Sequence, residues 1–246
     1  TGSNNTALGR LALYTNTTAS NNTAVGLSAL QANTTGANNV AVGKGALDTN
    51  TTGSYNIAIG VAALDDNTAG GGDIAIGANA LQTNTTGEDS VAIGNNSLRY
   101  NNANNNSAVG TSALTANTTG YNNAAFGYNA LPANTTGQYN TVIGSHGSTG
   151  ITTGGYNVTI GDQSVLGTVF NITSQSNRGI FGHNAIVSAY VKVAWTVTSD
   201  QRDKADITNF THGLDYINAL RPVNYVWDER SNYADGIRDG SKKKDL

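Results

Sequence analysis

The sequence has no cysteine, no methionine and only two prolines, and 12% of its 246 residues are charged. Without cysteine there is no disulfide framework, thiolate metal site or cysteine nucleophile. No run approaches the roughly 18 consecutive apolar residues of a membrane-spanning helix, and the first residues lack the features of a signal peptide. A net charge of −3 argues against nucleic acid as a partner. The missing initiator methionine indicates a piece of a longer protein.

Glycine is abundant by contrast, with 30 residues, and much of it recurs at a fixed spacing. Ten glycines follow one another at steps of 17 residues, with one step of 16: Gly9, Gly26, Gly43, Gly60, Gly77, Gly94, Gly110, Gly127, Gly144 and Gly161. A large apolar residue precedes each of them: Leu8, Val25, Val42, Ile59, Ile76, Ile93, Val109, Phe126, Ile143 and Ile160. The alternation in Val40-Ala41-Val42 is typical of a short strand with one face turned to a core. We expect the large column before the glycines to be buried.

The first eight copies also carry a leucine four residues after the glycine, and many continue into an Asn-Thr-Thr-Gly turn. One strand, a corner and a turn bury too little surface alone, so a continuous core requires the copies to stack. The sequence therefore predicts an all-β fold, a parallel β-solenoid shaft of about ten coils over residues 1–161. Stacking in register would align Asn5, Asn22, Asn39 and their equivalents into hydrogen-bonded ladders of amide side chains.

The repeat decays after Gly161, and a different organisation follows. Residues 162–198 are predicted to form a strand-rich neck, with extended segments at Val165–Phe170, Ile180–Phe181 and Ala185–Val197. Residues 199–246 are predicted to form a small α+β module that contains a helix at Thr208–Leu220 and a strand at Val223–Trp227.

Two resemblances refine this picture, and the first lies in the shaft. Ser90-Val91-Ala92-Ile93-Gly94 and its equivalents resemble the repeat of trimeric autotransporter adhesin heads, which form a left-handed parallel β-roll in each of three intertwined chains. The longer unit is similar to the shafts of tail-fibre-domain proteins from phages and bacteria. The coil is longer here than in the adhesin heads. This resemblance implies a homotrimer, in which two further copies of the chain are the partners.

The second resemblance begins at Ser199. The motifs Ser-Asp-x-Arg-x-Lys, Gly-Leu-Asp and Leu-Arg-Pro-Val follow in order up to Trp227, and they resemble the endosialidase-type C-terminal intramolecular chaperone of phage tail spikes and fibres. Asp203 departs from this pattern, since the family has an apolar residue there. The later Gly-x-Ile-Ala-Gln-like segment is absent, so residues 199–246 are expected to be an incomplete module.

The chaperone resemblance implies assembly of three chains and, in many members, one self-cleavage. Carried over to this sequence, Ser199 would be the nucleophile and Lys204 its base, with Asp200 and Arg202 in support and Thr198–Ser199 as the broken bond. The alternative is structural: Arg202 and Lys204 would form salt bridges within the trimer while Ser199 caps a turn. Both interpretations stay open on the sequence.

Two sets of side chains are further candidates. His146, His183 and His212 lie too far apart in the sequence to form a local metal-ligand pair, although His183 on a trimer axis could present three imidazoles to a metal; a solvated or core histidine is the alternative. No cofactor is expected. Five tyrosines recur near the repeat corners and could stack on sugars or merely shield the coil edge: Tyr55, Tyr121, Tyr128, Tyr139 and Tyr156.

These observations predict a structural, fibrous protein of a phage tail fibre in the virion. Its partners would be its own copies, other tail proteins and a host cell-surface receptor, such as a glycan or an outer-membrane component. A bacterial trimeric adhesin is the alternative. A polysaccharide-degrading spike is disfavoured, because the shaft lacks a repeated carboxylate pair and Asp65-Asp66 and Glu88-Asp89 stand isolated.

Overall fold

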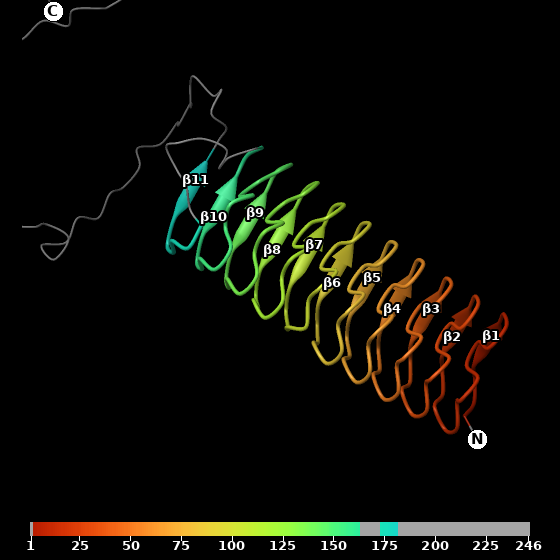
Figure 1. The fold of residues 1–246 in the computed structure, drawn as a ribbon. Helices are drawn as coiled ribbons and strands as arrows, with labels where there is room; N and C mark the ends of the chain where they lie inside the picture. Colours follow the sequence, from red (N-terminus) through yellow and green to blue (C-terminus); the bar gives the residue numbers. More distant parts are fainter. Residues whose placement is uncertain (1, 163–172, 182–246) are drawn as a thin grey trace, which may run out of the picture. The chain divides into compact units, whose positions relative to one another are not determined.

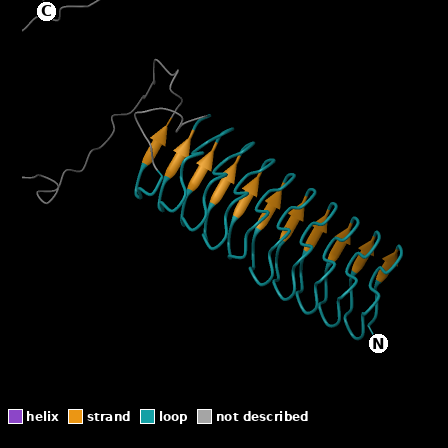
Figure 2. Ribbon diagram, viewed as in Figure 1, coloured by secondary structure: helices purple, strands orange, loops and turns teal. Residues whose placement is uncertain are grey.

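The computed structural model describes residues 2–162 and 173–181, which are all-β. Their eleven strands form one parallel sheet, in which neighbours in the sequence are neighbours in space. Figure 1 shows the coils stacked in a row, and Figure 2 shows the strands on one side of each coil with loops completing the turn. The chain divides into two compact units, Thr1–Ala189 and Tyr190–Leu246, and all described residues lie in the first. The predicted β-solenoid is therefore confirmed.

Each strand has three residues and sits just before a corner glycine or, for the last strand, beyond the regular repeat. The strands are β1 (Thr6–Leu8), β2 (Thr23–Val25), β3 (Val40–Val42), β4 (Ile57–Ile59), β5 (Ile74–Ile76), β6 (Val91–Ile93), β7 (Ser107–Val109), β8 (Ala124–Phe126), β9 (Thr141–Ile143), β10 (Val158–Ile160) and β11 (Gly179–Phe181). The segment Ile180–Phe181 is extended as predicted. Val165–Phe170, Ala185–Val197 and the module at 199–246 lie outside the described residues.

Equivalent repeat positions pair across the sheet. Ala24 lies opposite Ala41, and Ala41 opposite Ala58. The pairing is held by backbone hydrogen bonds, such as the 2.8 Å bond that the Gly43 N–H donates to the Val25 carbonyl. Because every coil repeats this register, a residue type conserved along the repeat becomes a continuous column along the shaft.

The strand side chains that face the core are not the ones that were predicted to do so. The middle residue of each strand from β2 to β10 is buried, whereas the large residue before the glycine points outward and is half-buried or exposed. The coil interior is narrow, and a small side chain there leaves space for the leucine of the same core. The prediction of a buried column was therefore wrong for this set: Leu8, Val25, Val42, Ile59, Ile76, Ile93, Val109, Phe126, Ile143 and Ile160.

The second apolar anchor is buried as predicted. The leucines after the corner, together with the alanines before them, have no exposed surface over most of the shaft: Ala29, Leu30, Ala46, Leu47, Ala63, Leu64, Ala80, Leu81, Leu98, Ala113, Leu114, Ala130 and Leu131. Leu47 and its equivalents adopt a left-handed backbone, with φ of 53° at Leu47. This conformation is unfavourable for leucine, and burial of the side chain offsets the cost.

The corner glycines are required both by conformation and by space. Gly60 has a φ of 139°, and a Cβ added there would lie 2.5 Å from the carbonyl oxygen of Gly77. We expect Gly60→Ala to lower the free energy of unfolding by about 3 kcal/mol, measured by thermal or denaturant unfolding.

Gly45 offers a matched control for this substitution. Its φ is 68°, and an added Cβ would find its nearest neighbour, the Asp65 Oδ1, at 3.6 Å. Asn79 and Asn96 occupy the same repeat position with φ of 56°. Gly45→Asn should change the free energy of unfolding by less than about 0.5 kcal/mol. Equal losses from both variants would contradict the role assigned to the corner.

In the single 16-residue coil, a side-chain oxygen replaces a backbone hydrogen-bond acceptor. In a regular coil, the backbone N–H groups of Thr34 and Thr35 donate to the Thr51 carbonyl at 3.0 and 3.1 Å. In the short coil the Asn102 Oδ1 takes the place of that carbonyl and accepts from Thr85 N and Thr86 N at 3.1 and 3.0 Å. The deletion therefore leaves these backbone donors satisfied, and the stack continues through it.

Candidate functional surfaces

Two chemical sites were predicted from the sequence, a self-cleavage site and a metal site. Ser199, Asp200, Arg202 and Lys204 of the cleavage hypothesis, and His183 of the metal hypothesis, all lie outside the described residues. Within residues 2–162 and 173–181, no group of three histidine or acidic side chains could hold a metal ion. The same residues include no helix that is long and apolar enough to cross a membrane. What the described part offers is three surfaces and one internal network.

The first surface is the outer sheet face, formed by the first and third residues of the strands. Its third-position column is apolar in all ten repeat strands, and Ile59, Ile76 and Ile93 are 39%, 36% and 37% exposed. None of the first and third positions of β1–β10 carries a charged side chain. Exposed apolar side chains that continue from coil to coil in this way make the outer sheet face a candidate interaction surface.

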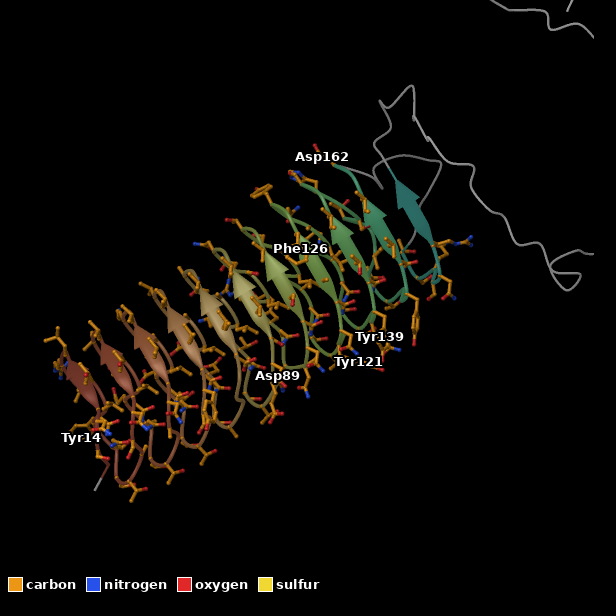
Figure 3. The ribbon with its side chains drawn as sticks, turned by 180° about the vertical axis from the view of Figure 1, so that it is seen from behind. Tyr14, Asp89, Tyr121, Phe126, Tyr139 and Asp162 are labelled. Atoms are coloured by element: carbon orange, nitrogen blue, oxygen red, sulfur yellow. The ribbon has the colours of Figure 1, made fainter. Side chains whose placement is uncertain are left out.

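The second surface is a tyrosine cluster on one turn edge, composed of Tyr121, Tyr139 and Tyr156. Tyr139 stacks on Tyr156 with ring centroids 4.8 Å apart and an interplanar angle of 16°, and Tyr121 meets Tyr139 edge-on at 5.4 Å. Figure 3 shows Tyr121 and Tyr139 along one long edge, with Asp162 at the opposite edge. Three of the five predicted tyrosines are thus brought together.

The other two predicted tyrosines stand apart from this cluster. Tyr128 packs edge-on against His146 at 5.0 Å, which places His146 in an aromatic contact. Tyr55 is 69% exposed and makes no ring contact with another described residue. It borders the third surface, a groove that also contains Glu88 and Asp89.

Two columns of asparagine form the internal network. In the first, the Asn22 Oδ1 accepts a 2.9 Å hydrogen bond from the Asn39 backbone N–H, and the Asn22 Nδ2 donates to the Gly36 carbonyl at 3.0 Å. The predicted ladder is therefore present, but over the first coils it joins side chains to backbone rather than amide to amide. Amide-to-amide bonds appear in this column only from Asn123 onward, where Asn123 Nδ2 donates to Asn106 Oδ1 at 3.3 Å.

The second column belongs to the Asn-Thr-Thr-Gly turns and does pair amide with amide. The Asn50 Nδ2 donates to the Asn33 Oδ1 at 2.9 Å, and the Asn67 Nδ2 donates to the Asn50 Oδ1 at 2.8 Å. Each of these asparagines also donates to the glycine carbonyl of its own turn, as Asn67 does to Gly70. Most of these buried amides are satisfied in this way, and among the described residues the Oδ1 atoms of Asn67 and Asn134 are the exceptions.

Asp73 keeps the backbone bonds of the first column, since its N–H donates to Asn56 Oδ1 and its Oδ1 accepts from the Ser90 N–H, but it interrupts the second column. It is buried at the position where Asn56 stands in the preceding coil, and burial is the main cause that raises its pKa to about 7. Its Oδ2 accepts a 2.9 Å hydrogen bond from Asn84 Nδ2, which in the regular pattern would donate to Asn67. The Asn67 Oδ1 is left buried without a donor. The signal for this site was visible in the sequence, since aspartate replaces asparagine four residues before Gly77.

The remaining acids near the surface show smaller perturbations. Burial raises the pKa of Asp65, and the neighbouring carboxylates of Asp66 and Asp48 raise it further. Burial also raises the pKa of Asp48.

Comparison with known families identifies the C-terminal segment of the chain. Residues 199–243 match the family model described as the chaperone of endosialidase. The predicted resemblance of this segment is confirmed. No curated protein and no solved structure matched the chain. A repetitive solenoid followed by an endosialidase chaperone segment fits a structural protein of the phage tail fibre or tail spike type.

Proposed function

We propose that this protein is the homotrimeric shaft of a phage tail fibre, with a C-terminal chaperone that assembles it. The observation that carries the proposal is the outer sheet face: an apolar column without charged side chains runs along the whole repeat and has no partner within the described chain. The chaperone match at residues 199–243 favours the fibre over a bacterial adhesin.

Three chains around a common axis would bury this face. Ile59, Ile76 and Ile93 keep 36–39% of their surface exposed, so burying the remainder would contribute roughly 1 kcal/mol for each, and the gain repeats along the coils. Because the coils stack in register, each layer of one chain meets an equivalent layer of its partners. A rod built in this way is long-lived and needs no catalytic residue in the shaft. It holds a receptor-contacting part at a distance in the virion, where the other partners are tail proteins and a host cell-surface receptor.

The chaperone segment supports a prediction about self-cleavage. When the full-length gene product is expressed, mass spectrometry under denaturing conditions should show a chain that ends at Thr198. The Ser199→Ala variant should remain intact, because it lacks the hydroxyl that attacks the bond. Asp203→Asn serves as a matched control that should still be cut.

The same samples test the fibre function. The parent should run as a heat-resistant oligomer on gels and dissociate only after strong denaturation. Cleavage that persists in Ser199→Ala would reject the assignment of the nucleophile. Intact chains in a heat-resistant oligomer would keep the fibre and make Ser199 and Lys204 structural residues, whereas a heat-labile single chain would reject the fibre itself.

A further inference from the structure

A groove interrupts the turn edge of the shaft at the fifth coil. It has a volume of about 480 Å³ and is bounded by Tyr55 on one side and by Glu88 and Asp89 on the other, with Gly71 and Gly72 between them. We call it the glycine slot. The groove is open to solvent, so a ligand would lie against its wall rather than be enclosed.

The slot exists because one layer of side chains is missing. Asn38, Tyr55, Gly72, Asp89 and Asn105 occupy the same repeat position, and all have positive φ. Of these five, only Gly72 lacks a side chain. Since adjacent coils lie about 4.8 Å apart, the Tyr55 and Asp89 layers are about 10 Å apart, and a flat ring fits between them once the Asp89 carboxylate turns away from Gly72.

The tyrosine cluster shows what a filled layer looks like. Tyr139 and Tyr156 stand at this same repeat position in adjacent coils, and their rings stack at 4.8 Å with an angle of 16°. A ring placed at the layer of Gly72 would stack on Tyr55 in the same manner. Tyr55 is 69% exposed, so its ring is available for such a contact.

The opposite wall supplies hydrogen-bond acceptors. Within the described residues, the side chains of Glu88 and Asp89 accept no hydrogen bond and form no ion pair. An added Cβ at Gly72 would collide with the Asp89 Oδ1, so this carboxylate reaches over the floor of the slot. Figure 3 shows Asp89 on the same long edge as Tyr121 and Tyr139.

A flat slot with an aromatic wall and free carboxylates matches the chemistry of a sugar ring. The C–H face of a pyranose packs on an aromatic ring, and its hydroxyl groups donate to carboxylate oxygens. We propose that the glycine slot binds one pyranose ring of a host-surface glycan, between Tyr55 and Asp89. This proposal rests on the fibre function, because only a fibre exposed on the virion would bring this edge near host-surface glycans.

The test uses the assembled parent protein on an array of bacterial surface polysaccharides. Gly72→Asn fills the slot with the residue that Asn38 and Asn105 have at the same position, and the collision it creates is only with the movable end of Asp89. We expect at least one polysaccharide to bind the parent, and Gly72→Asn and Tyr55→Ala each to weaken that binding by about tenfold or more. Tyr139→Ala, in the separate tyrosine cluster, is the matched control and should bind as the parent does.

Two results would overturn the proposal: no polysaccharide binds, or the slot variants bind polysaccharide as the parent does. Native mass spectrometry of each sample separates these failures from failure of the fibre. An intact oligomer without glycan binding rejects only the slot, whereas a single chain rejects the fibre. If Gly72→Asn does not fold, Tyr55→Ala decides, since an exposed side chain is removed there.

Discussion

Replacement of both Ile76 and Ile93 by lysine is expected to convert the assembled protein into single chains that remain folded. The two side chains are 36% and 37% exposed on the outer sheet face and lie outside the coil interior, so the substitutions leave the core of each chain intact. In a trimer packed through this face, six lysines would lose hydration without acidic partners, a cost of several kcal/mol for each buried ion. Native mass spectrometry and far-ultraviolet circular dichroism measure the two parts of this prediction.

Val61→Lys is the matched control for this experiment. Val61 is 53% exposed and stands just after a corner glycine, at the repeat position where Arg10 and Lys44 already occur. A lysine is therefore compatible with the assembly at this position, and the variant should assemble as the parent does. Assembly of the Ile76→Lys/Ile93→Lys variant with the parent's mass would show that the outer sheet face is not the interface.

Asp73→Asn is expected to raise the stability of the shaft at alkaline pH and to remove a pH dependence. The pKa of Asp73 is raised from 3.8 to about 7, mainly by burial, with Asp89 and Glu88 adding to the shift. A raised carboxyl pKa means that the folded state binds the proton more tightly than the unfolded state. The stability it gives is full below about pH 4 and is lost as pH rises toward 7 and beyond, by up to about 4 kcal/mol.

The asparagine variant should also repair the hydrogen-bond network. An amide at position 73 could donate to the Gly87 carbonyl, as Asn56 donates to Gly70 at 2.9 Å. Asn84 would then be free to donate to the Asn67 Oδ1, which now lacks a donor. Thermal unfolding at pH 5 and pH 8 should show a falling midpoint for the parent and a nearly constant one for Asp73→Asn.

The reverse substitution provides the control for this effect. Asn56→Asp places a second buried carboxyl at the same repeat position one coil earlier, and it should steepen the pH dependence. An unchanged difference between pH 5 and pH 8 in Asp73→Asn would show that another group is responsible.

The repeat allowed much of the fold to be predicted, because each coil restates the same constraints. The predicted role of a buried leucine such as Leu30, or of a corner glycine such as Gly60, is supported by the equivalent residue in several other coils. The direction of the strand side chains could not be obtained in this way. Alternation in Val40-Ala41-Val42 defines two apolar faces, and only the narrow coil interior decides that alanine faces inward.

The surfaces were less accessible to sequence reasoning, because they depend on contacts between coils. The sequence named Tyr55 as a candidate, but the slot beside it arises from the missing side chain of Gly72 in the next coil. Likewise, the effect of Asp73 depends on the hydrogen bond that Asn84, in the same turn edge, donates to its carboxylate. Ser199 and Lys204 stay predictions, since they lie outside the described residues.

We propose that the outer sheet face joins identical chains into a trimeric shaft. The most direct test is the mass of the parent protein in solution, determined by native mass spectrometry over a range of concentrations. We expect one species with three times the mass of the chain, stable on dilution. A single chain that stays monomeric at every concentration would contradict it.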